Sequence, residues 1–180
     1  DARVLRAVQT VVDEGLARPI VIGRPGVVEA RVEKDGLRIR AGQHFELVNP
    51  DSDPRYKDLW QDYYDLTCRK GVGVEYAKRE VRRRTTLIGA MLIRHGYADA
   101  LLCGTFGRHA LHLKYIEQVI GRRPGVESFH AMNMIILPSR TLFIGDTYVN
   151  YDPSAEQVAE MTVLGSEEVR RFGLAPKVAL

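Results

Sequence analysis

The sequence predicts an α/β fold whose mainly parallel sheet carries helices on both faces. Helical and extended apolar patterns alternate along the chain, and the extended segments are short, continuous apolar runs such as residues 20–22 and 98–103. Strands that are buried on both faces have this continuous character. Regular alternation of strands and helices is typical of parallel sheets covered by helices.

The composition is that of a globular protein long enough for one domain, or for one domain and part of a second. The chain has 180 residues, of which 45% are hydrophobic and 27% charged. No apolar run approaches the roughly 20 residues of a membrane span, and the N-terminus has no apolar signal core. Cys68 and Cys103 are too isolated to indicate a disulfide framework or a zinc site. We therefore expect a cytoplasmic protein without a membrane partner.

The formal charge of +3 is modest, but arginine outnumbers lysine. The planar guanidinium group suits phosphate and carboxylate ligands, although a GC-rich genome gives the same bias. Only Arg82-Arg83-Arg84 forms a basic run, and no aromatic residue interrupts it. A nucleic-acid partner is not expected, because such surfaces cluster their basic residues.

The first half of the chain predicts two helix–strand pairs and then a long helix. The expected elements are a helix over residues 2–14, a strand over 19–23, a helix over 25–34 and a strand over 45–49. Asp53 offers an N-cap and Pro54 a first helical residue, while Gly71 can end that helix.

The second half predicts a broken helix, a strand, a helix, a hairpin and a final helix. The broken helix is expected over residues 75–95 with a break near 85–86, the strand over 98–103 and the next helix from about 111 to 120. The two strands of the hairpin are expected over 128–137 and 141–145, and the final helix from 152 to 173. The hairpin places a first subdomain at residues 1–127 and the start of a second, incomplete subdomain at 128–180. Residues 177–180 resemble the opening of a further strand, so we expect the chain to end before its fold is complete.

The loop Gly104-Thr105-Phe106-Gly107-Arg108 is a candidate ligand site at the end of the expected strand 98–103. Its glycines allow close backbone approach, the next helix presents free N–H groups, and Arg108 adds positive charge. These features favour an anion such as a phosphate, although a purely structural turn is equally compatible. The loop lacks the G-K-[ST] ending of a P-loop, so nucleotide hydrolysis is not indicated.

Two further loops carry candidate residues. Residues 23–26 contain Pro25 and no dinucleotide fingerprint, which favours a simple strand-to-helix turn. Asp146 closes an apolar strand, and its carboxylate could accept a hydrogen bond from a ligand or hold the fold. Asp152 is expected to be a helix cap.

Catalytic and metal-binding patterns are lacking. His109 and His112 are three residues apart on one expected helix, but no acidic third ligand accompanies them, so no metal site is predicted. No G-x-S-x-G, Cys–His or paired-carboxylate arrangement indicates hydrolytic catalysis.

Residues 85–107, TTLIGAMLIRHGYADALLCGTFG, resemble the phosphate acetyl/butyryl transferase family. The resemblance continues through residues 116–120, 123–126, 146–150, 152–157 and 176–180, and residues 3–8 and 19–23 fit the family's beginning, so it spans nearly the whole chain. In detail, CGTFGR at residues 103–108 and DTYVN at 146–150 most resemble the transferase-like domain fused to bacterial NADP-dependent malic enzymes.

The resemblance implies a two-subdomain architecture similar to isocitrate and isopropylmalate dehydrogenases, with a CoA ester in the cleft. Lys114 stands where the family's acetyltransferases place a ligand-binding arginine. The implied ligand-binding residues are Gly104, Thr105, Gly107, Arg108, Lys114, Asp146 and Asn150. The family's serine–arginine–aspartate catalytic group belongs to sequence downstream of residues 176–180, so no catalytic residue is expected in this segment.

The resemblance therefore implies a non-catalytic regulatory domain that binds acetyl-CoA as an effector and supports a homo-oligomer. Its partner would be a malic-enzyme domain in the same polypeptide, which would hold NADP and a divalent Mg or Mn ion. A genuine phosphate acetyltransferase and a structural oligomerisation module with a vestigial cleft are the alternatives.

Overall fold

The computed structural model describes all residues from Asp1 to Leu180 and divides into two compact units. The first unit is Asp1–Gly121 and the second is Arg122–Leu180. The expected subdomain boundary at residues 127–128 stays a prediction.

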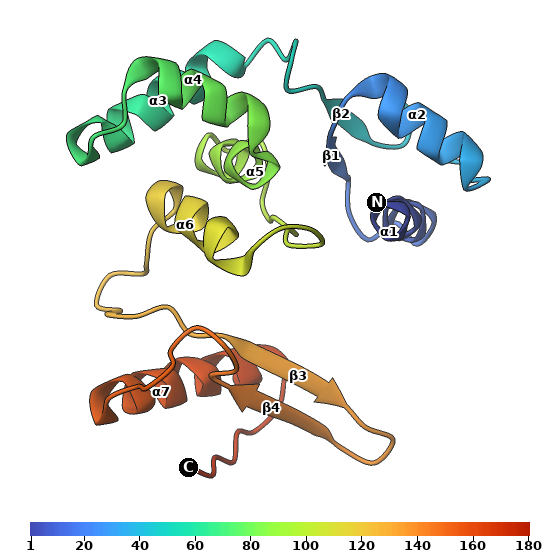
Figure 1. Ribbon diagram of the computed structural model, residues 1–180. Helices are drawn as coiled ribbons and strands as arrows, with labels where there is room; N and C mark the ends of the chain where they lie inside the picture. The colour runs from blue at the N-terminus through green and yellow to red at the C-terminus, as the bar shows by residue number, and fades with distance from the viewer. The chain divides into compact units, whose positions relative to one another are not determined.

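The first unit contains seven segments of helix and two short strands (Figure 1). In chain order they are α1 (Ala2–Asp13), β1 (Ile20–Ile22), α2 (Pro25–Lys34), β2 (Glu46–Val48), α3 (Tyr56–Thr67), the 3-10 turn η1 (Cys68–Lys70), α4 (Val74–Arg83), α5 (Thr85–Arg94) and α6 (His109–Val119). The expected helices and the first two strands are confirmed, including the break between α4 and α5. That break occurs at Arg84, whose backbone is extended with φ −110° and ψ 96°.

Strands β1 and β2 form a parallel pair with helices on both faces. Ile20 and Ile22 pack against the helical cluster of α3 to α6, whereas Val21 and Leu47 pack against the cluster that includes α1 and α2. Successive side chains of a strand point to opposite faces, so a continuous apolar run can serve two cores at once.

The larger core lies among α3, α4, α5 and α6, which Figure 1 shows as one group of helices. Tyr63, Leu87, Met91 and Tyr115 are essentially inaccessible there. This cluster holds α5 against α6, and it thereby supports the chain segment that joins them.

The expected strand over residues 98–103 is wrong, because this segment is irregular in the structure. β1 and β2 pair only with each other, and an extended segment without a partner forms no ladder. Leu101 still packs, with its side chain over Gly89, but Leu102 is fully exposed.

Asp53 is not the N-cap of α3. The helix begins at Tyr56 after a turn, and the Asp53 carboxylate instead accepts hydrogen bonds from the Arg55 backbone N–H and guanidinium. The hydrogen bonds from Arg55 lower the pKa of Asp53, and they outweigh the opposing effect of burial. The pKa of this carboxyl therefore lies below its usual range.

The second unit is an antiparallel hairpin of β3 (Met132–Ile136) and β4 (Thr141–Gly145) with helix α7 (Ala155–Arg171). The hairpin is confirmed. Helix α7 begins from a capping box in which Ser154 accepts from the Gln157 N–H, so the expected cap at Asp152 is wrong. The expected strand at residues 177–180 is also not formed.

The chain is therefore a mixed α/β protein with one parallel and one antiparallel strand pair. The mainly parallel sheet expected from the sequence is not confirmed. No helix combines the length and apolar character that crossing a membrane would require.

Candidate functional site

The loop between α5 and α6 is the most open polar loop of the first unit. Residues 102–110 are all exposed. Gly104 and Gly107 have φ values of +94° and +104°, a region that side chains other than glycine rarely adopt. The two glycines therefore supply backbone conformations that other residues would adopt only at a steric cost.

His112 holds this loop from the first turns of α6. Its Nε2 lies 2.8 Å from the Phe106 carbonyl oxygen, and its Nδ1 lies 2.6 Å from the hydroxyl oxygen of Thr86 on α5. Both ring nitrogens are thus used within the protein. The structure assembles no metal-ligating cluster from its histidines, cysteines and carboxylates.

Arg108 is the residue before α6 and its side chain makes no capping hydrogen bond. The N–H of Ala110 in the first turn likewise has no acceptor. Unpaired amides at a helix N-terminus and a guanidinium group both favour an anion. The electrostatics of this end of α6 suit a phosphate.

Lys114 lies one turn further along α6, beside a buried carboxylate. Its Nζ is 5.7 Å from the centre of the Tyr115 ring, and the Tyr115 hydroxyl donates to Glu80 on α4. Arg84 also donates to Glu80, over 3.2 Å. Burial acts to raise the pKa of Glu80, but hydrogen bonds from Tyr115 and Arg84, helped by the Lys114 charge, hold it below its usual range. Lys114 itself stays exposed and available to a ligand.

Asp146 in the second unit is saturated with internal hydrogen bonds. One carboxylate oxygen accepts from the backbone N–H groups of Ala131, Tyr148 and Val149 at 3.1–3.2 Å. The other accepts from the backbone N–H of Asn150 at 3.0 Å and from its side-chain amide. A carboxylate has about four lone-pair positions, so this one has none left for a ligand.

The same hydrogen bonds set the charge state of Asp146. Partial burial acts to raise its pKa, but the donors at Val149, Asn150, Tyr148 and Ala131 outweigh burial and lower the pKa. The ionised carboxylate therefore acts as an organiser of the loop that follows β4.

Asn150 extends this organisation toward α7. Its amide nitrogen lies 2.8 Å from the Phe129 carbonyl oxygen and 3.2 Å from Nδ1 of His130. His130 is nearly buried, and its Nε2 lies 3.0 Å from Glu160. A continuous polar chain thus links the β4 loop to α7.

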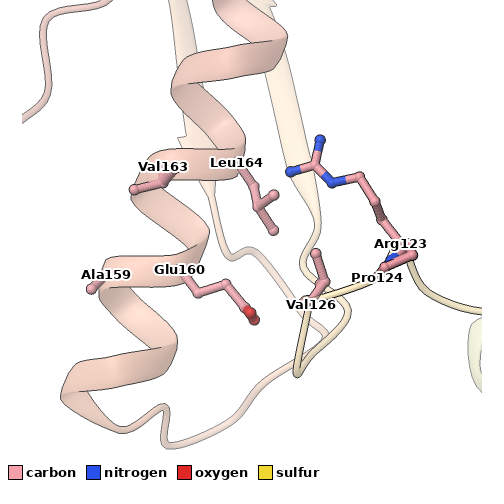
Figure 2. A pocket seen from close by; sticks show the side chains of 8 residues that line it. Arg123, Pro124, Val126, Ala159, Glu160, Val163 and Leu164 are labelled. Carbon is pink, nitrogen blue, oxygen red and sulfur yellow. The ribbon is translucent and has the colours of Figure 1, made fainter.

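A hollow of about 330 Å³ lies between residues 123–126 and α7. Figure 2 shows Val126, Glu160 and Leu164 facing this space. Glu160 has its oxygens occupied by the N–H groups of residues 127 and 128 and by His130. These donors, led by the N–H of residue 127, lower its pKa. Arg123, also on the rim, is paired with Glu167 over 2.8 Å.

The structure thus separates the predicted site residues into two groups with different surroundings. Gly104, Thr105, Gly107, Arg108 and Lys114 lie in the first unit, and Asp146 and Asn150 lie in the second. The sequence prediction missed the contacts of Thr86 and His130. It considered His112 only as a metal ligand, although a histidine four residues after Arg108 is placed to reach back to the loop.

The α5–α6 loop and the start of α6 thus combine two glycines of positive φ, an unpaired main-chain amide and two exposed cations, Arg108 and Lys114. Groups of this kind favour a negatively charged ligand. The chain belongs to the phosphate acetyl/butaryl transferase family, which matches it over residues 1–180.

Two relatives illustrate this similarity. The NADP-dependent malic enzyme of Salmonella typhimurium is 50% identical over 180 residues, which are 100% of this chain and 24% of that enzyme. The phosphate acetyltransferase of Nitratidesulfovibrio vulgaris is 30% identical over 180 residues, again 100% of this chain and 25% of that protein.

Among solved structures, a phosphotransacetylase from Streptococcus pyogenes matches with a TM-score of 0.85 and 28% identity. The match covers 98% of this chain and 53% of the other. The chain therefore spans about a quarter of these relatives and about half of the solved phosphotransacetylase.

Proposed function

We propose that this chain is a phosphotransacetylase-like regulatory domain of a malic enzyme, and that it binds acetyl-CoA as an allosteric effector. The observation that supports this most directly is the difference in identity between its two kinds of relative. The chain is 50% identical to a malic enzyme and 30% identical to a phosphate acetyltransferase over equal lengths.

The effector is proposed to bind at the loop between α5 and α6. Acetyl-CoA carries a pyrophosphate and a further phosphate, and the loop supplies matching groups. Gly104, Thr105 and Gly107 would give close backbone approach, while Arg108 and Lys114 would pair with phosphate oxygens. A charge-assisted hydrogen bond of this kind contributes about 1.5–3 kcal/mol.

Asp146 and Asn150 are proposed to contribute differently from the original expectation. Because the Asp146 oxygens are occupied by protein donors, the residue would hold the β4 loop in shape and make no contact with the effector. Asn150 would hold the same loop through Phe129 and His130.

The full-length protein is proposed to oxidise malate in a separate malic-enzyme domain that holds NADP and a Mg or Mn ion. Acetyl-CoA would regulate that reaction in a homo-oligomer by binding two conformational states with different affinity. Such differential binding is the physical requirement for allosteric coupling between separate sites.

The test is acetyl-CoA binding by the full-length protein, measured by isothermal titration calorimetry together with inhibition of malate oxidation. Arg108→Ala and Lys114→Ala should each weaken binding about 10- to 150-fold, since each removes a charge-assisted contact worth about 1.5–3 kcal/mol. The inhibition curves should shift by the same factors. Arg18→Ala is the matched control, because Arg18 is also an exposed arginine of the first unit.

Two results would contradict the proposal. Unchanged affinity in both variants would place the effector elsewhere. A wild-type protein that binds no acetyl-CoA would leave a structural oligomerisation module as the better description.

A phosphate acetyltransferase is the second candidate, and the 0.85 TM-score to a solved phosphotransacetylase favours it. It would transfer the acetyl group of acetyl phosphate to the CoA thiol and release phosphate. Formation of acetyl-CoA from these two substrates by the purified full-length protein, well above a buffer blank, would favour this candidate over the regulatory domain.

A further inference from the structure

Thr86 and His112 form a hydrogen-bonded chain that ends on the main chain of the α5–α6 loop. We infer that these two residues are positioning residues that aim the N–H of Gly107 at a phosphate oxygen of the bound ligand. This inference rests on the proposed acetyl-CoA site and adds to it the groups that preorganise the loop.

The Phe106 carbonyl oxygen determines the direction of each hydrogen bond in the series from Thr86 through His112 to Phe106. A carbonyl oxygen can only accept, so His112 Nε2, 2.8 Å from the Phe106 oxygen, carries a hydrogen. In the neutral ring Nδ1 is then an acceptor, and the Thr86 hydroxyl donates to it over 2.6 Å. Thr86 is only 4% exposed, so water cannot readily replace it as the donor. The imidazole ring is therefore held at both nitrogens.

The ring in turn sets the orientation of one peptide group. The Phe106–Gly107 peptide is trans, and in a trans peptide the C=O and N–H point in opposite directions. With the Phe106 oxygen directed at His112, the Gly107 N–H is directed away from the ring. No acceptor in the protein pairs with this N–H, and Gly107 is exposed.

The loop lies tightly on the ring, and this fit selects glycine at position 107. A Cβ placed on Gly107 would lie 3.0 Å from His112 Nε2, and its φ of +104° disfavours other residues. Arg108 follows Gly107 directly, so the exposed N–H of Gly107 and the guanidinium group of Arg108 belong to consecutive residues. Fixed donors bind more strongly than mobile ones because less conformational entropy is lost on binding.

The experiment compares three variants of the full-length protein. Thr86→Val keeps the shape of the side chain but removes the hydroxyl, Thr86→Ser keeps the hydroxyl, and His112→Ala removes the ring. Acetyl-CoA affinity is measured by calorimetry. Loop mobility is measured without ligand, as the rate of limited trypsin cleavage after Arg108 detected by mass spectrometry.

We expect Thr86→Val and His112→Ala to weaken acetyl-CoA binding about tenfold, the equivalent of one hydrogen bond to a charged group. Both should speed cleavage after Arg108, while Thr86→Ser should stay within about twofold of wild type on both measures. Rescue by serine is the readout that a space-filling role would not produce, because valine fills the site better than serine.

The outcomes separate this inference from the proposed function. Wild-type affinity in Thr86→Val and His112→Ala overturns the positioning role and leaves the effector site standing. Equal weakening by Thr86→Val and Thr86→Ser also overturns it, since the hydroxyl would then not be the relevant group. Absence of acetyl-CoA binding by the wild-type protein overturns the proposed function, and with it the ligand-directed part of this inference.

Discussion

Two candidate ligand loops of this chain use their main-chain N–H donors in opposite ways. In the loop at residues 146–150, three backbone N–H groups point inward to the Asp146 carboxylate. In the loop at residues 104–108, a main-chain carbonyl points inward to His112, which leaves the next N–H directed outward. The loop at residues 146–150 therefore uses its N–H donors within the protein, whereas the loop at residues 104–108 leaves the N–H of Gly107 exposed.

The direction of these hydrogen bonds decides whether a loop is only stabilised internally or also has main-chain N–H groups exposed to a ligand. A carboxylate inside a loop organises amides by satisfying them, so the result is a stable turn with little capacity for an anion. An imidazole donor inside a loop organises it through its carbonyl, so amides stay available. Either residue type can appear in a ligand-binding motif, and the hydrogen-bond direction distinguishes their roles.

Asp146→Ala is expected to have the largest effect, and to act on local stability. Several amides would lose one shared acceptor, which should lower the free energy of local opening by about 2–4 kcal/mol, or roughly 30- to 1000-fold in exchange rate. Hydrogen exchange of the amides at residues 148–150 in the full-length protein measures this. If protection stayed unchanged while acetyl-CoA affinity fell, the carboxylate would face the ligand and the contrast between the loops would fail.

Gly107→Ala is expected to have an intermediate effect, and to act on binding. The new side chain meets His112 and the backbone must leave its φ of +104°, with a strain of about 1–3 kcal/mol. The corresponding loss of acetyl-CoA affinity is about 5- to 150-fold. Gly26→Ala is the matched control, since a Cβ there meets nothing within 4 Å. Normal affinity in Gly107→Ala would show that the loop need not keep this conformation.

Acidification is expected to have the smallest effect and to act on the two loops unequally. The folded-state pKa of Asp146 is lowered, so its stabilising contribution is fully present above the unfolded value of about 3.9. The contribution is lost as the pH falls through the lower, folded pKa. The loop at residues 104–108 contains no carboxylate.

Protection of the amides at residues 148–150 against exchange, corrected for the intrinsic rate, should therefore be constant from pH 7 to about pH 4.5 and decline below about pH 4. The decline should be absent in Asp146→Ala. A decline that begins well above pH 4.5 would contradict the assignment to Asp146, whose pKa is lowered.

Much of the fold could be predicted because its signals are local. The apolar spacing in α1, the break before Thr85 and the turn between β3 and β4 depend on residues within a few positions of each other. The glycine loop at residues 104–108 was also recognisable, because glycine adopts positive φ values at little steric cost, and Gly104 and Gly107 both do so.

Predictions that required a distant partner were the ones that failed or stayed incomplete. Residues 98–103 have the composition of a strand, but a strand exists only where another pairs with it. Asp53 and Asp152 have good capping chemistry, yet Arg55 engages the first, and Ser154 caps α7 in place of the second.

The sequence by itself determined the family, the helices, the first two strands, the β3–β4 hairpin and the position of the glycine loop, since these follow from local spacing and residue identity. Tertiary structure alone decided what the polar residues do. Thr86 and His112 are 26 residues apart in the chain and 2.6 Å apart in space, and Asp146 meets Ala131 across the hairpin. A side chain's role depends on which donors and acceptors reach it, and the fold brings those together.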